Sequence, residues 1–167
     1  MQAQNYKLVQ DDSSLEWTGY GEIGGFSQTG TIEAKEGFLS YQNGQLTAAK
    51  IIVNMKTMKS KNKNVAQHLK NKDFFYIKKY PEASIELKEI VNDTVSAQLD
   101  IRGISQDVRF LIETKTDGDV IVLRGKLIVD RTKHEIKYNS KSFFKGLGNQ
   151  AIKNQFDLIF DLCFKLE

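Results

Sequence analysis

Cysteine and proline are almost absent from this sequence, which contains one of each, and it has only two histidines. The single cysteine, Cys163, excludes an internal disulfide, so cysteine usage does not distinguish the cytosol from an exported compartment. Two distant histidines and one cysteine are a poor set of metal ligands, and neither histidine lies in an H-E-x-x-H pattern. No apolar run approaches the roughly 20 residues of a membrane-spanning helix. We therefore expect no bound metal and no such helix.

Motifs of the common enzyme classes are also absent from the sequence. It has no G-x-S-x-G nucleophile elbow and no Walker loop, and the glycines of GYGEIGG lack the strand-turn-helix context of a dinucleotide site. Cys163 lies in a strongly alternating segment, which favours a structural thiol over a reactive one. The sequence thus predicts a protein that is not an enzyme and uses no cofactor.

Alternation of apolar and polar residues dominates the sequence. In residues 156–167 the even positions are apolar and most of the odd positions are polar, and residues 94–102 alternate in the same way. This period of two is typical of half-buried antiparallel strands. Together with turn signals such as Asn43-Gly44 and Arg102-Gly103, it predicts strands near residues 6–10, 15–19, 30–35, 38–42, 46–56, 83–90, 94–102, 108–115, 120–129, 135–139 and 156–166.

One helix interrupts this pattern. Val65 and Leu69 recur at helical spacing, which predicts a short helix within Asn62–Lys72. Residues 143–152 are compatible with a second helix or with a loop, because Gly146 and Gly148 weaken a helix.

Many antiparallel strands with one helix inserted midway predict a sandwich or a closed barrel, in a single domain over residues 1–167. Long strands and glycines within strand-like runs favour closure; these glycines are Gly19, Gly21, Gly24, Gly25 and Gly125. A barrel of about eight strands has an interior just wide enough for one small apolar ligand.

Positive charge is concentrated in one region. Between Lys50 and Lys79 there are nine lysines and one acid, Asp73, whereas the rest of the chain has more acidic than basic residues. The region is either a solvated loop or a rim that faces an anion. Aromatic residues beside the lysines are able to stack on bases, but no arginine lies in this region, so we expect no nucleic-acid partner.

Phe74, Phe75 and Tyr76 form a block of adjacent aromatics directly after the predicted helix. Phe74 and Phe75 either fill one end of the core or act as a cap over a cavity in the barrel. The sequence leaves both interpretations open.

The same stretch, HLKNKDFFYIKKYPEASIEL, resembles the signature of the YceI-like proteins. The matching residues are His68, Leu69, Lys70, Asp73, Phe74, Phe75, Tyr80 and Pro81, whereas Asn71 and Tyr76 depart from it. AQLDIRGISQDVRFLI resembles a second family segment, with Asp100 and Ser105 in place of threonines. Two further segments resemble a compact subgroup of the family from Bacteroidetes-type bacteria. They are EWTGYGEIGGFSQTGTIEAKEG and the C-terminal segment from VDRTKHEIKYN onward.

This resemblance implies an all-β, antiparallel, lipocalin-like barrel that binds, transports or stores a long-chain lipid of the polyisoprenoid or isoprenoid quinone type, without catalysis. The apolar strand faces and the cap give the lumen candidates, namely Trp17, Phe26, Ile32, Phe38, Phe74, Phe75, Leu99, Phe110, Val122 and Phe160. The candidates at the mouth of the barrel, for the head group, are His68, Lys70, Lys72 and Asp73. A phosphate head is expected near a lysine rim, defined as Lys59, Lys61, Lys63, Lys70 and Lys72.

Two other function classes stay open. The first is an enzyme acting on a lipid head group with His68 and Asp73 as an acid–base pair, although their i, i+5 spacing does not favour contact. The second is a stress-related periplasmic interaction protein that docks on a partner, or transiently on an anionic membrane, through Lys50–Lys79. The sequence does not predict the oligomeric state.

Localisation is predicted from two features. The family likeness implies export to the periplasm or secretion, and Ala3-Gln4 after a lone Met resembles the junction left by a removed signal peptide. We expect the gene to encode an apolar signal segment upstream of Gln2.

Overall fold

The structure is a computed structural model that describes residues 3–167, and it is built almost entirely of antiparallel β-strands. Met1 and Gln2, which belong to the predicted signal-peptide junction, lie outside the described residues. The strands are β1 (Gln4–Leu8), β2 (Ser14–Gly21), β3 (Ser27–Gln42), β4 (Gln45–Ser60), β5 (Glu82–Val91), β6 (Thr94–Ile101), β7 (Ile104–Asp117), β8 (Val120–Asp130) and β9 (Ile152–Leu166).

The helical elements are short. Helix α1 spans Lys63–Leu69, and the 3-10 turns are η1 (Gln10–Asp12), η2 (Arg131–His134) and η3 (Gly148–Gln150). Among the described residues, no helix is long and apolar enough to span a membrane.

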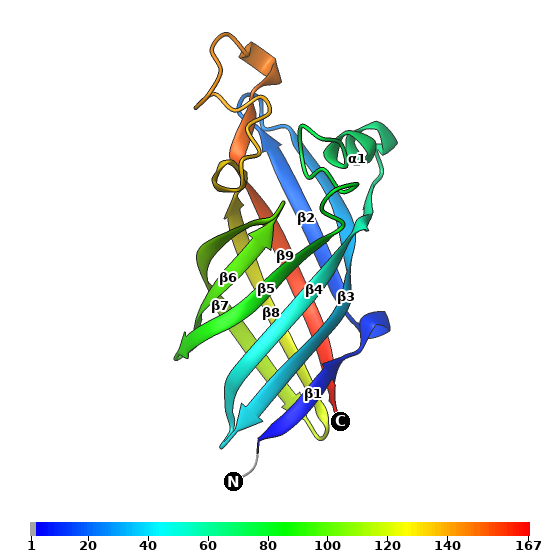
Figure 1. Ribbon diagram of the computed structural model, residues 1–167, viewed down its shortest axis with the longest axis vertical. Coiled ribbons are helices and arrows are strands. Elements are labelled where there is room, and N and C mark those ends of the chain that lie inside the picture. Colours follow the sequence, from blue (N-terminus) through cyan, green and yellow to red (C-terminus); the bar gives the residue numbers. More distant parts are fainter. Residues whose placement is uncertain (1–2) are drawn as a thin grey trace.

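The sheet closes on itself because β1 and β2 both pair with β3 on one side and with β9 on the other, one after the other along these strands. In β1, Tyr6 pairs with Leu39 and Leu166, and β2 pairs with the same two strands farther along. Turn η1 separates β1 from β2, and β3 also pairs with β4. The nine strands therefore form eight positions of a closed antiparallel barrel, which confirms the predicted fold (Figure 1).

Two tight turns confirm the sequence signals for hairpins. Asn43 and Gly44 have φ angles of 56° and 74°, and Arg102 and Gly103 have φ angles of 55° and 73°. Positive φ at both central positions twists a two-residue turn to match the twist of the strands that it joins. These turns connect β3 to β4 and β6 to β7.

Helix α1 begins where the sequence predicts it. The side chain of Asn62 accepts hydrogen bonds from the backbone N–H groups of Asn64 and Val65, at 3.1 and 3.3 Å. This N-cap satisfies two donors that the first turn leaves free. The helix ends at Leu69, and residues 70–80 continue as turns that lead to β5.

Two sequence predictions of strands are wrong in detail, and one open alternative is decided. Residues 135–139 are not a strand, because Glu135 has a left-handed φ of 62° that ends η2 and turns the chain. Residues 143–152, for which the sequence left a helix and a loop open, form a loop with the 3-10 turn η3 before β9 begins. Residues 30–35 and 38–42, predicted as two strands, belong to one strand, β3, which continues through a bulge between Ala34 and Glu36.

The two ends of the barrel differ. Helix α1, the turn between β2 and β3, and residues 131–151 gather at one end, which we call the mouth end, and both termini lie at the other (Figure 1). The terminal end is filled with side chains, since Leu39 and Phe164 are 0% exposed and Ile121 is 2% exposed. The terminal end is therefore part of the packed core.

Candidate functional site

The lumen holds two adjoining cavities that are stacked along the barrel. The larger, which we call the mouth chamber, has a volume of about 390 Å³, and the smaller, the deep chamber, has about 110 Å³. Six residues line both chambers: Leu15, Val53, Ala83, Leu99, Leu127 and Leu158. The larger volume lies in the range of about 300–1,000 Å³ that is usual for small-molecule pockets.

Inward-facing residues of the strands make the walls of both chambers apolar. Ile32 of β3, Met55 of β4 and Val129 of β8 line the mouth chamber, and Val95, Ala97 and Phe110 line the deep chamber. The rings of Phe110 and Phe160 meet edge to face in the deep chamber, with centroids 5.7 Å apart. Such walls favour an alkyl or isoprenoid chain over a polar solute.

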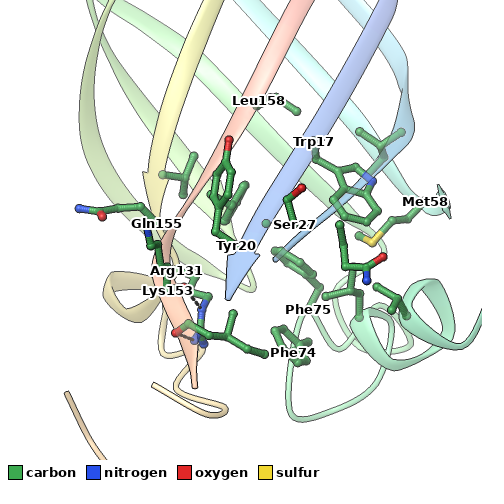
Figure 2. A pocket seen from close by; sticks show the side chains of 18 of the residues that line it. Trp17, Tyr20, Ser27, Met58, Phe74, Phe75, Arg131, Lys153, Gln155 and Leu158 are labelled. Carbon is green, nitrogen blue, oxygen red and sulfur yellow. Dashed lines mark hydrogen bonds between the residues drawn. The ribbon is translucent and has the colours of Figure 1, made fainter. Parts of the chain in front are cut away.

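Trp17 is the largest side chain in the wall of the mouth chamber (Figure 2). Its indole Nε1 donates to the carbonyl oxygen of Thr31 at 3.2 Å, so the polar edge of the ring is satisfied. Gly30, the cross-strand partner of Trp17, leaves space for the ring, because a Cβ at this position would lie 2.3 Å from it. The remaining ring surface contributes to the chamber wall.

A cap of aromatic side chains covers part of the mouth chamber. Phe74, which is 5% exposed, contacts both His68 and Tyr138, with ring centroids 5.1 and 5.2 Å apart. His68 meets Tyr138 edge to face at 4.7 Å, and Phe75 meets Phe156 at 6.0 Å. Figure 2 shows Phe74 and Phe75 beside the chamber near α1. The aromatic block is therefore both part of the core and a lining of the chamber, which unites the two interpretations left open by the sequence.

The expectation that His68 and Asp73 do not meet is wrong. His68 Nε2 lies 2.8 Å from Asp73 Oδ2, because the helix ends at Leu69 and the following turns bring Asp73 back toward α1. His68 lines the mouth chamber, whereas Asp73 is exposed and does not. The pair fixes the cap to the helix.

Most predicted lumen residues line a chamber. Trp17, Ile32, Phe74, Phe75 and Leu99 line the mouth chamber, and Leu99, Phe110 and Phe160 line the deep chamber. Phe26 also lines the mouth chamber, but it is 70% exposed and lies at the edge of the chamber. Their roles in ligand binding stay predictions.

Phe38 was predicted to face the lumen and instead lies on the outer surface, 45% exposed. The reason is the bulge in β3: Ala34 pairs with Val53 and Glu36 with Ile52, so Lys35 is an extra residue. An extra residue shifts the alternation by one position. Before the bulge even positions face inward, and after it the odd positions do, as the buried Leu39 shows.

Val122 also faces away from the lumen. Its neighbours Ile121 and Leu123 are buried, at 2% and 7% exposed, and Val122 pairs with Cys163 on the opposite face. Because several consecutive residues of β8 are apolar, alternation alone does not show which set points inward. Leu123 takes the place in the deep chamber that was predicted for Val122.

The predicted head-group lysines do not line the chambers. Lys70 is half-buried and Lys72 is exposed, and neither is among the lining residues of the mouth chamber. Lys59, Lys61 and Lys63 are exposed on and beside α1. The lysine rim thus lies outside the cavity, at the mouth end.

Two polar residues of the mouth chamber, Tyr20 and Arg131, were not predicted from the sequence. Tyr20 lines the chamber, and its hydroxyl donates to a carboxylate oxygen of Asp157. This hydrogen bond is the main reason that the pKa of Tyr20 is raised, with burial adding to it. Arg131 also lines the chamber and is 3% exposed. The only feature of the sequence that could have indicated Arg131 as a chamber residue is its position directly after an apolar strand.

Residues 3–167 contain no group of three or more His, Cys, Asp or Glu side chains placed to hold a metal ion. Burial raises the pKa of the Cys163 thiol, with Asp12 and Asp161 adding to the effect, which opposes thiolate formation.

A closed antiparallel barrel with an apolar lumen and a short helix at its mouth defines a lipocalin-like architecture. Residues 6–164 match the family model of the YceI-like domain, and the chain belongs to this family. Comparison with curated protein sequences found no match.

Solved structures show the same fold. Burkholderia cenocepacia BcnA is 14% identical, with a TM-score of 0.73, and the alignment covers 93% of this chain and 98% of BcnA. A polyisoprenoid binding domain from Saccharophagus degradans is 12% identical, with a TM-score of 0.71 and coverage of 97% and 98%. The Campylobacter jejuni YCEI protein is 17% identical, with a TM-score of 0.60 and 81% coverage of each chain.

Proposed function

We propose that the protein binds one long-chain apolar lipid in its lumen, without catalysis, and serves to transport or store it. The observation that carries this proposal is the pair of adjoining apolar chambers, which extend from the mouth end toward the filled terminal end. Burial of the chain contributes about 0.8 kcal/mol per CH₂, from which the costs of association are subtracted.

A polyisoprenoid or an isoprenoid quinone is the proposed class of ligand. Support comes from the family and from the polyisoprenoid binding domain of Saccharophagus degradans, which shares the fold. The branched methyl groups of an isoprenoid fit a wall of mixed aliphatic and aromatic side chains. In this proposal the tail extends past Leu99 into the deep chamber and the head stays near the mouth.

The test is identification of the native occupant. Protein purified without added ligand is analysed by native mass spectrometry, and its organic extract is analysed for lipids. We expect a co-purified lipid of one main class. A protein that is free of lipid and that takes up neither a polyprenol nor a fatty chain in titration would contradict the proposal.

The contact of His68 with Asp73 is the observation that favours a second candidate, an enzyme acting on a lipid head group. The same contact is explained by the cap, because the His68 ring packs against Phe74 and Tyr138. His68→Ala separates the two candidates. Loss of turnover on isoprenoid phosphates with unchanged lipid binding would support the enzyme, and absence of turnover in the parent protein excludes that activity.

We infer that the mouth end contacts anionic membranes when the ligand is exchanged. Four exposed apolar side chains lie on loops at this end: Ile23, Phe26, Phe143 and Phe144. The loops are joined by the ion pair of Lys141 with Glu22, at 2.6 Å, and the backbone N–H of Glu22 donates to Ala151.

The charge of these loops fits the same partner. The sequence contains no Asp or Glu between Glu135 and Asp157, whereas Lys137, Lys141, Lys145 and Lys153 lie in this interval. The lysine rim adds positive charge at the same end. Exposed apolar groups flanked by lysines are typical of surfaces that bind anionic bilayers. The proposed membrane contact therefore includes the mouth loops as well as the Lys50–Lys79 region expected from the sequence.

Export to the periplasm or secretion is proposed on the family membership. Sequencing the gene upstream of Gln2 tests this. An apolar signal segment is expected, and a native start at Met1 would contradict it.

A further inference from the structure

Arg131 is a buried cation in the wall of the mouth chamber. It is the first residue of η2, directly after β8, and is 3% exposed. Figure 2 shows it beside the chamber, next to Lys153 and near Phe74. The surrounding wall is mainly apolar, so this guanidinium is an unusual group for a cavity that would only hold a hydrocarbon chain.

Three backbone carbonyl groups hold the guanidinium in place. Nε donates to Lys153, Nη1 to Ile136 and Nη2 to Ile152, at 3.0, 2.9 and 3.0 Å. A guanidinium has five N–H groups in a fixed planar arrangement. One N–H on each terminal nitrogen is therefore left after these three bonds, and the side chain has little freedom to move.

Within residues 3–167, the guanidinium of Arg131 forms no ion pair with a carboxylate. The adjacent carboxylate of Asp130 accepts hydrogen bonds from the backbone N–H and the hydroxyl of Thr132. Among the side chains that line the cavity, Phe74 faces this cation, with its ring centroid 5.8 Å from Arg131 Cζ.

Burial of a cation without an anion is unfavourable unless another gain offsets it. Burial accordingly lowers the pKa of the Arg131 guanidinium, and the negative charge of Asp130 opposes this effect in part, although arginine remains protonated in proteins. The carbonyl bonds stabilise the charge in part. An anionic group in the chamber would complete the set of partners.

We propose that Arg131 binds the ionised head group of the lumen ligand, a phosphate or a carboxylate, while its tail lies in the two chambers. This inference rests on the proposed function, since it assumes a chain lipid in the lumen. The planar guanidinium matches the oxygens of both anions. Its position inside the chamber makes the contact stronger than one formed in water, because the local dielectric is low.

Binding of the head group by the lysine rim would depend more strongly on salt than binding by Arg131. Its lysines are mostly exposed, so their attraction for an anion is screened when salt shortens the Debye length from about 10 Å at 0.1 M to about 3 Å at 1 M. A contact with the buried Arg131 is much less screened. The salt dependence of head-group preference therefore distinguishes Arg131 from the rim.

The test compares farnesyl phosphate with farnesol, which have the same tail, and uses inorganic phosphate as a third probe. Trp17 is the only tryptophan and lines the chamber, so its fluorescence reports binding. We expect the parent protein to bind farnesyl phosphate at least about tenfold tighter than farnesol at high salt. Inorganic phosphate alone should bind weakly, because it has no tail.

Arg131→Met keeps the apolar stem and removes the charge, and Arg131→Lys keeps the charge without the planar group. We expect Arg131→Met to bind both probes within about twofold of each other and Arg131→Lys to retain part of the preference. A matched control replaces the five lysines of the rim by Gln, and it should keep the preference at high salt. Farnesol should bind the parent and Arg131→Met equally, which also verifies that the variant is folded.

If the parent protein binds farnesyl phosphate and farnesol with equal affinity, Arg131 does not bind the head group, although the protein still binds lipid. This outcome is observed without any variant. A preference that is unchanged in Arg131→Met, or that disappears only in the rim variant, would also overturn the role of Arg131. If neither probe binds the parent, the proposed function itself fails for isoprenoid ligands, and the inference fails with it. Tight binding of inorganic phosphate in the parent would show an anion site that does not depend on a lipid tail and would likewise contradict the inference.

Discussion

Trp17 and Gly30 form a cross-strand pair in which the indole covers the glycine. A Cβ at position 30 would lie 2.3 Å from the Trp17 ring and 1.9 Å from the carbonyl oxygen of Lys59. Because the second contact is with backbone, rotation of the ring alone does not relieve it. We expect Gly30→Ala to destabilise the protein by about 1–3 kcal/mol through overpacking. Urea denaturation followed by Trp17 fluorescence measures this change.

Gly19 provides the matched control for Gly30. It lines the same chamber in β2, but a Cβ there would have no heavy atom within 4 Å. Gly19→Ala should therefore change the free energy of unfolding by less than about 0.5 kcal/mol. Similar destabilisation by both substitutions would mean that the Trp17–Gly30 contact is not the cause.

Leu99 lies where the two chambers adjoin, because it is one of the six residues that line both of them. We expect Leu99→Phe to shorten the longest tail that the lumen accepts, while short-chain alcohols bind as in the parent protein. A series of alcohols of increasing length, titrated by Trp17 fluorescence, locates the chain length at which affinity stops rising.

The control for Leu99→Phe is Val122→Phe, which introduces the same side chain on the outer side of the barrel wall. It should leave the chain-length limit unchanged. If Leu99→Phe also leaves the limit unchanged, the tail does not reach the deep chamber. Overpacking at Leu99 is expected to cost about 1–3 kcal/mol of stability, so both variants are first checked for folding.

His134 makes stability depend on pH. It is 1% exposed, its Nδ1 lies 2.9 Å from the carbonyl oxygen of Ile104, and burial lowers its pKa below 6.5. The folded protein therefore keeps His134 neutral at a pH where the unfolded chain binds a proton. This contribution is fully present above about pH 6.5 and is lost as the pH falls toward the folded pKa, with a slope of at most about 1.4 kcal/mol per pH unit.

The variant His134→Gln has no titrating group at this position and is expected to be less stable near pH 7. Between about pH 7 and pH 5 its free energy of unfolding should fall less steeply than that of the parent. Chemical denaturation at several pH values measures both slopes. Parallel slopes would show that His134 does not titrate differently in the two states.

The mouth loops should bind anionic vesicles. We expect the protein to sediment with vesicles that contain phosphatidylglycerol and to remain in solution with phosphatidylcholine alone, because each lysine near an anionic surface contributes about 1 kcal/mol. Replacing Phe26, Phe143 and Phe144 by Ser should reduce sedimentation, and the same should follow from Lys141→Gln with Lys145→Gln.

Other exposed apolar residues provide a control for the vesicle experiment. Leu111, Ile128 and Ile159 are 68%, 59% and 50% exposed and lie on β7, β8 and β9 in the barrel wall. Their replacement by Ser should not change sedimentation. An equal loss in both triple variants would indicate nonspecific adsorption and remove the support for a membrane contact at the mouth.

The sequence predicted the barrel but not the direction of every side chain. Alternation identified the inward face where one side of a strand is polar, as in β6, whose Val95, Ala97 and Leu99 are all buried. It failed at Phe38 because one extra residue in β3 exchanges the two faces, and bulges leave no clear signal in a single sequence. It failed at Val122 because β8 is apolar on both faces.

The polar residues of the cavity were harder to predict. Arg131 follows an apolar strand, where an exposed charge is the ordinary expectation, and its burial depends on carbonyl groups of residues 136, 152 and 153. His68 and Asp73 meet only because the chain reverses after Leu69. These contacts depend on loop conformation, which hydrophobic periodicity does not encode.

Closure of the barrel by β9 also determines when folding is completed. This strand pairs with β1, β2 and β8, so residues 4–21 must find residues 152–166 across almost the whole chain. Contacts of such large sequence separation form late and slow folding. Until β9 is in place, the sheet from β2 to β8 has two unpaired edges, which are templates for pairing between molecules. We therefore expect substitutions that weaken β9 to reduce the yield of soluble protein through aggregation during synthesis, even where the completed barrel is only slightly less stable.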